Sequence, residues 1–315
     1  MIRSRALIGA GAAVVATVLF TLNDTIIKLV SGQYPLMQVV LIWTVFSTLF
    51  LLGLIIPLTD GHAGLRTQRP LLHLARGLCV VVSNFSFFFA VASMPLADAV
   101  AVFFVAPLLI TAASVLFLGE RVRALQWVAV LIGLLGVGLI AKPGTEAFTP
   151  ISLLPLLAAL TYAGLQILTR SVGETESKTA LTFYIQVTFL VVCSVGGLWL
   201  GDGHLAGSAD PSVAFLLRPW IWPPVGDLGF FLALGFSSAA GGMLISQAYR
   251  VAPAALVAPF EYVGLPMSVL WGILVFGDWP DRLALLGMGL IVLAGLLAIW
   301  RDAERGAVDP AGGLA

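Results

Sequence analysis

Ionisable side chains inside otherwise apolar segments are the residues of this chain whose types and spacing could do chemistry. The first such segment carries Asn23, Asp24 and Lys28. Asp24 and Lys28 are four residues apart, so on a helix they share a face and can pair. The pair could be structural, pinning the helix, or it could act as a gate or substrate contact. Lys28 can also extend its stem outward to water.

A second acidic position is Glu261, which precedes Tyr262 and stands between Pro259 and Pro266. Each proline removes a helical hydrogen bond and frees a carbonyl. Irregular backbone of this kind is tolerated at membrane depth where it lines a cavity or is buried in protein. The Glu261 carboxylate could take a proton, attract a cationic substrate, or pair with Arg250.

Several neutral polar side chains also fall in apolar segments. Each fits an interhelical hydrogen bond as well as a ligand contact. Together with the ionisable residues they give nine candidates for substrate binding or coupling: Asn23, Asp24, Lys28, Asn84, Tyr162, Gln166, Gln247, Glu261 and Tyr262.

Composition places these side chains in a membrane. The 315 residues are 60% hydrophobic and 10% charged, whereas a soluble domain carries about 25% charged residues. The net charge of zero offers nucleic acid no basic surface. The cysteines and histidines lack the spacing of a disulfide framework or metal site, and the sequence has no nucleotide-binding P-loop and no catalytic Ser–His or paired-aspartate constellation. We therefore expect an all-α integral membrane protein without metal, cofactor or enzymatic activity.

Spanning helices need about 20 mainly apolar residues. Ten stretches qualify: 7–30, 35–57, 71–93, 97–118, 125–141, 151–170, 179–200, 226–249, 254–276 and 283–300. With the N-terminus inside, only four of the sixteen Lys and Arg residues fall outside, namely Lys28, Lys142, Arg218 and Arg282. Because Lys and Arg favour the cytoplasmic side, both termini are predicted to be cytoplasmic. The remaining long loop, 201–225, could lie on the membrane surface.

An internal repeat divides the chain. The segment 90–120 aligns without a gap with 248–278, so that Pro95 falls on Pro253, Gly119 on Gly277 and Glu120 on Asp278. Five helices per copy make the two copies inverted, which is typical of alternating-access transporters. We expect repeats at 1–142 and 148–301 and a short cytoplasmic tail at 302–315; duplication for structural reasons alone is the alternative.

Short motifs add a family resemblance. They are N-D-x-x-x-K at 23–28, R-P-x-x-H-x-x-R-G at 69–77, A-P-L at 106–108, A-P-[FY]-x-Y at 258–262 and W-P-D at 279–281. In these the chain resembles the EamA-type drug/metabolite transporters, in a branch similar to bacterial S-adenosylmethionine and riboflavin uptake carriers. Glu261 departs from the pattern, because related carriers can have Arg at that position.

The resemblance implies ten helices in two inverted EamA repeats in the bacterial inner membrane. It also implies secondary active transport of a small polar metabolite through a central cavity. Riboflavin uptake is the first candidate; export of amino acids or related metabolites, or carriage of S-adenosylmethionine, are the alternatives, with an intramembrane enzyme or a channel more remote. Glycines in 125–141 and 283–300 suit close packing between the halves or a homodimer interface.

Overall fold

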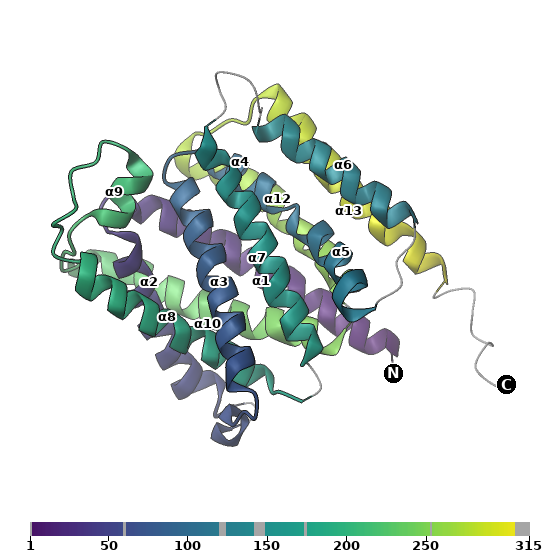
Figure 1. Cartoon of the computed structure of the whole chain (residues 1–315), viewed down its shortest axis with the longest axis horizontal. Helices are drawn as coiled ribbons and strands as arrows, with labels where there is room; N and C mark the ends of the chain where they lie inside the picture. Colours follow the sequence, from purple (N-terminus) through teal and green to yellow (C-terminus); the bar gives the residue numbers. More distant parts are fainter. Residues whose placement is uncertain are drawn as a thin grey trace.

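The computed structural model describes residues 2–58, 61–119, 124–141, 149–172, 175–252 and 254–305. Within these ranges all regular structure is helical and no strand occurs (Figure 1). The predicted all-α class is confirmed.

Helices and short helical turns follow one another along both halves of the chain. The first half contains α1 (Ile2–Val30), α2 (Leu36–Phe50) continued by the π-helical η1 (Leu51–Ile55), the short η2 (His62–Leu65), α3 (Pro70–Val91), α4 (Leu96–Phe103), α5 (Ala106–Leu118) and α6 (Ala124–Ala141). The second half contains η3 (Pro150–Leu153), α7 (Leu154–Ser171), α8 (Lys178–Leu200), α9 (Pro211–Leu217), η4 (Val225–Asp227), α10 (Leu228–Val251), α11 (Ala254–Val257), η5 (Ala258–Val263), α12 (Gly264–Trp271), η6 (Gly272–Phe276) and α13 (Arg282–Arg305).

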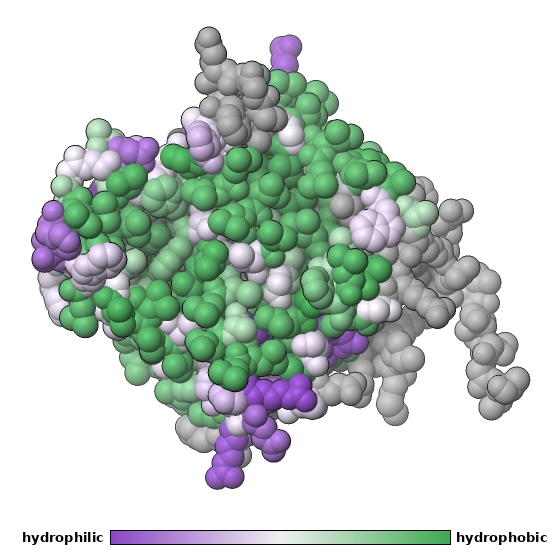
Figure 2. Space-filling model, viewed as in Figure 1, coloured by the Kyte–Doolittle hydropathy of each residue, from purple (hydrophilic) through white to green (hydrophobic). Residues whose placement is uncertain are grey.

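Helix length and apolarity make this a multi-pass membrane protein. Seven stretches are long and apolar enough to cross a bilayer: Leu7–Val30, Leu36–Ile55, Pro70–Val91, Leu96–Leu118, Pro150–Ser171, Lys178–Leu200 and Val225–Val251. Three shorter apolar helices, Leu131–Ile140, Phe260–Phe276 and Arg282–Ala294, overlap the remaining predicted spans. Apolar side chains cover the middle of the face in Figure 2, and hydrophilic ones gather toward its margins.

The predicted domain boundaries are only partly within the described chain. The division between 142 and 148 lies outside it, as do residues 306–315 of the predicted tail. The last helix, α13, runs to Arg305, beyond the boundary predicted at 301.

The repeated segment has the same local irregularities in both copies. Helix α4 ends at Phe103 and α5 begins at Ala106; in the other copy α11 gives way to the 3-10 helix η5, which ends at Val263. A shift of 158 places Val105 on Val263 (105 + 158 = 263). Gly119 and Gly277, also related by this shift, both end their helices with left-handed φ of +67° and +71°, which glycine adopts without steric cost.

Helix packing follows an approximate two-fold pattern. Helix α1 packs most extensively against α10, and α3 against α7. Among the long helices, α7 is the first of the second half and α10 is the third, so they correspond to α1 and α3. The contact of α1 with α10 is therefore the counterpart of the contact of α7 with α3. Helix α2 packs against its counterpart α8, and α6 against α13, which lie side by side at the edge of the bundle in Figure 1.

One end of the bundle holds the turns 31–35, 92–95, 201–224 and 277–281, and we call it the Lys28 end. Lys28 Nζ lies 3.1 Å from Asp278 Oδ2 and 3.0 Å from the Met94 carbonyl oxygen. Burial raises the pKa of Tyr34 to about 12, so its hydroxyl stays protonated and donates to Asp227. These contacts join turns that are far apart in sequence.

The long connection 201–225 packs onto this end. The Arg218 guanidinium donates to the Ser31 carbonyl at 3.0 Å, and Phe215 of α9 is fully buried. Trp222, by contrast, is 94% exposed. The connection is therefore anchored on the helix ends, with the Trp222 ring exposed.

Close packing of α6 on α13 depends on two glycines. A Cβ built on Gly136 would lie 2.6 Å from the Gly287 carbonyl oxygen, and one on Gly287 would lie 2.6 Å from the Gly136 carbonyl oxygen. We predict that Gly136→Ala and Gly287→Ala each lower the free energy of unfolding by about 1–3 kcal/mol, because backbone must move apart. Thermal unfolding of the purified protein in detergent measures this.

Gly138→Ala is the matched control, since a Cβ there meets no atom within 4 Å. Equal stability of the Gly136 and Gly138 variants would contradict the packing account.

Candidate functional site

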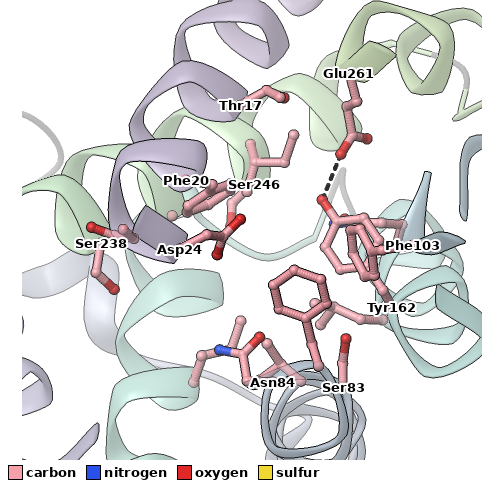
Figure 3. Close-up of a pocket in the computed structure, with 18 of the residues that line it drawn as sticks. Thr17, Phe20, Asp24, Ser83, Asn84, Phe103, Tyr162, Ser238, Ser246 and Glu261 are labelled. Atoms are coloured by element: carbon pink, nitrogen blue, oxygen red, sulfur yellow. Dashed lines mark hydrogen bonds between the residues drawn. The ribbon is translucent and has the colours of Figure 1, made fainter. Parts of the chain in front are cut away.

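A cavity of about 160 Å³ lies between the helices. Its walls come from α1, α2, α3 and α4 in the first half and from α7, α8, α10 and η5 in the second (Figure 3). Helices α6 and α13 contribute no described wall residue. The cavity therefore lies between the two halves of the chain and beside the helix breaks.

Asp24 presents the carboxylate of α1 to this cavity. Figure 3 shows it beside Phe20 and facing the same space as Tyr162 on α7. Within the part of the chain that the structure describes, no group forms a hydrogen bond or ion pair with this carboxylate. The predicted Asp24–Lys28 pair is wrong, because Lys28 lies in the last turn of α1 and reaches Asp278 instead. Asp24 is thus available to a bound proton or ligand.

Glu261 is held by two tyrosine hydroxyls. Tyr162 donates to Oε2 at 2.8 Å, and Tyr249 donates to Oε1. Glu261 is only 5% exposed, and hydrogen bonds to both oxygens offset the cost of burying the group. The predicted pair with Arg250 is wrong: Arg250 is at the end of α10, where its Nε donates to Gln247 Oε1 at 3.3 Å.

Aromatic rings form much of the remaining wall. Phe103 lies 5.4 Å from Tyr162 between ring centroids, and Trp43 lies 5.8 Å from Phe88. Phe87 also lines the cavity. These rings pack on one another in tilted and edge-to-face pairs and give the cavity a largely aromatic wall.

Arg76, near the start of α3, also lines the cavity. Arg76 is 1% exposed, and its guanidinium donates to Thr169 Oγ1 and to the Leu181 carbonyl, each at 3.0 Å. One turn earlier, His73 Nε2 lies 3.3 Å from Glu176 Oε2. We call this end of the bundle, with the turns 61–69 and 175–177, the Arg76 end. Its network joins α3 to α7 and α8.

The nine predicted residues divide into two groups. Six line the cavity: Asn23, Asp24, Asn84, Tyr162, Gln166 and Glu261. The other three, Lys28, Gln247 and Tyr262, are not among the wall residues. Lys28 pairs with Asp278, and the Gln247 side chain accepts a hydrogen bond from Arg250. The Tyr262 ring packs on Phe104, with 6.1 Å between ring centroids.

Sequence reasoning missed Arg76 and Thr169 as wall residues. Arg76 was counted with the cytoplasmic positive charges, although its place in the R-P-x-x-H-x-x-R-G motif, one turn after His73, was a signal. Among the described residues no cluster of three or more His, Cys, Asp or Glu is arranged to hold a metal.

Comparison with known proteins decides the family. A model of the EamA-like transporter family matches residues 7–142. A riboflavin transporter of Rhizobium johnstonii is 30% identical over 302 residues, which cover 96% of this chain and 94% of that protein. The chain belongs to the EamA-like transporter family. This places it in the drug/metabolite transporter superfamily, as the motifs predicted.

The names of other relatives of this EamA-family protein specify different substrates. An S-adenosylmethionine uptake transporter of Rickettsia bellii is 26% identical, covering 94% of each chain. The pseudopaline exporter CntI of Pseudomonas aeruginosa is 30% identical, covering 90% of this chain and 92% of the exporter. A solved crystal structure has a TM-score of 0.68 at 18% identity, covering 96% of this chain and 99% of its own, and so shares the fold.

The tyrosine contacts of Glu261 give a stability prediction. Tyr249→Phe removes the donor to one carboxylate oxygen and leaves that oxygen buried without a partner. We expect a loss of about 1–3 kcal/mol in the free energy of unfolding, measured by thermal unfolding in detergent. Tyr262→Phe is the control, because the Tyr262 hydroxyl is buried with no hydrogen-bond partner in the described chain. Equal losses in the two variants would contradict the assignment.

Proposed function

We propose that this EamA-family protein is a secondary active transporter that moves a small polar metabolite by alternating access, and is not an enzyme. The main support for this proposal is the cavity between the two halves. It lies beside helix breaks that recur at the same position in both copies of the repeat. Broken helices at a repeat interface are typical of substrate sites in secondary transporters.

The proposal includes the topology. Ten helices form two inverted repeats, 1–142 and 148–301, in the bacterial inner membrane with both termini cytoplasmic. The reciprocal packing of α1 on α10 and α3 on α7 supports two equivalent halves. The distribution of Lys and Arg supports the orientation, which puts the Lys28 end outside and the Arg76 end in the cytoplasm.

Riboflavin uptake is the specific function to test first. Support comes from the full-length relationship to a riboflavin transporter. The cavity adds aromatic faces for a flat ring and amide groups of Asn84 and Gln166 for its polar edge. Export of another metabolite is the second candidate, favoured by an exporter relative at equal identity. The direction of transport follows the substrate gradient and its coupling.

Growth of a bacterial riboflavin auxotroph that lacks its own importer tests uptake. We expect this gene to rescue growth on limiting riboflavin. Asp24→Ala and Glu261→Ala should lower uptake roughly tenfold or more at equal membrane expression, as expected for loss of a charged contact. Asp202→Asn, in the exposed long connection, is the matched control. No rescue with the protein present in the membrane would reject riboflavin import and favour export or another metabolite.

Proton coupling would use one of the two cavity carboxyl groups. Glu261→Gln keeps the size of the side chain but removes its ability to take up a proton. If Glu261 is the coupling group, the variant should lose the response of uptake to an imposed pH gradient while retaining substrate exchange. Uptake that still follows the gradient would reject Glu261 and leave Asp24, for which Asp24→Asn is the equivalent test.

A further inference from the structure

The ion pair at the Lys28 end lies about one helical turn along α1 from Asp24, which lines the cavity. Ile27 lines the cavity wall, and the next residue, Lys28, lies 3.1 Å from Asp278. The Lys28 ammonium also lies 4.9 Å from the centroid of the Phe276 ring, a favourable cation–π distance. The pair therefore lies just beyond the cavity wall at this end, and neither of its residues is among those that line the cavity.

The pair joins the two proposed repeats. Lys28 lies in the last turn of the first helix of one, and Asp278 follows the fourth helix of the other. Asp278 is fixed by the backbone before it: Gly277 has a φ of +71°, and the Asp278 amide donates to the Gly272 carbonyl at 3.0 Å. The carboxylate is thus presented by a hydrogen-bonded turn, and its contact with Lys28 is one of the contacts that join the halves at this end.

Part of the arrangement recurs at the Arg76 end. Lys28, in the last turn of α1, donates to the Met94 carbonyl between α3 and α4. Arg170, in the last turn of α7, donates at 3.3 Å to the Arg250 carbonyl, just before the junction of α10 with α11. These are corresponding places in the two halves. The Lys28 contact lies within the first half, and the Arg170 contact lies within the second. The Lys28–Asp278 pair adds a contact across the halves; the repeat counterpart of Asp278, Glu120, lies outside the described residues.

We propose that Lys28 and Asp278 form a reversible latch that holds the outer mouth of the cavity closed. The inference rests on the proposed alternating-access function, because access from the Lys28 end requires the halves to separate there. Partial exposure suits this role: the side chains are 16% and 32% exposed, and ion pairs that remain in contact with water are weak enough to break in each cycle.

A cysteine placed in the cavity reports on the latch without knowledge of the substrate. The background replaces the native thiols (Cys79→Ser, Cys193→Ala), and Asn84→Cys supplies one reporter on the cavity wall. A membrane-impermeant maleimide is added to the outer face of intact cells, and the labelling rate is measured on protein in the membrane. We expect Asp278→Asn and Lys28→Met to raise this rate roughly three- to fivefold, as expected for loss of a partly exposed pair.

Two further variants make the test specific. The double exchange Lys28→Asp with Asp278→Lys should return labelling toward the parent rate, since it restores an attractive pair. Asp202→Asn removes a carboxylate from the same end without touching the latch and should leave labelling unchanged. In inside-out vesicles the latch variants should not label faster than the parent.

Unchanged labelling in both single variants would overturn the latch, as would failure of the double exchange to slow labelling. Repeating the measurement with Ser238→Cys on α10 guards against an unreactive first reporter; no acceleration at either site also overturns it. The outcome is independent of riboflavin rescue. Faster labelling without rescue supports the latch and rejects the substrate, whereas rescue without faster labelling supports transport and rejects the latch.

Discussion

The cost of placing polar groups in a bilayer governs this structure. A charge or an unpaired backbone group at membrane depth has no water to solvate it, so the protein must supply its partners or enclose it in a cavity. Glu261 follows the first course, with a tyrosine hydroxyl on each carboxylate oxygen. Asp24 follows the second and faces the cavity.

The same constraint explains where the helices are irregular. The breaks at 104–105 and in η5 replace the regular helical pattern with turn hydrogen bonds, and both lie beside the cavity within the packed bundle. Elsewhere α6 and α13 pack closely through Gly136 and Gly287. None of their described side chains lines the cavity. Helices next to the cavity carry the polar groups, and the peripheral pair supplies packing.

Much of the fold could be predicted from the sequence, because apolar length and the 158-residue repeat are strong one-dimensional signals. They predicted the all-α class and aligned Gly119 with Gly277, and both glycines end helices with a left-handed φ. Side-chain pairing was harder. Helical spacing correctly puts Asp24 and Lys28 near one another along α1, but Lys28 is in the last turn, where a residue 250 positions away competes for it.

Some residues of the site could also be predicted from the sequence, and others could not. Intramembrane polarity singled out Asp24, Tyr162 and Glu261, which the cavity brings together. Arg76 was missed because a basic residue near a helix start reads as an interfacial charge, and only tertiary packing buries it against Thr169 and Leu181. Partners contributed by other helices are set by three-dimensional proximity, for which a single sequence carries no direct signal.

The cavity, the paired breaks and the contacts at both bundle ends support the proposal of a carrier whose two halves alternate around a fixed site. Counterflow in proteoliposomes containing the purified protein tests this most directly. Vesicles preloaded with unlabelled riboflavin should take up labelled riboflavin faster than empty vesicles, and the initial rate should saturate with concentration. Flux that rises linearly with concentration and ignores the preload would contradict a carrier and indicate a channel.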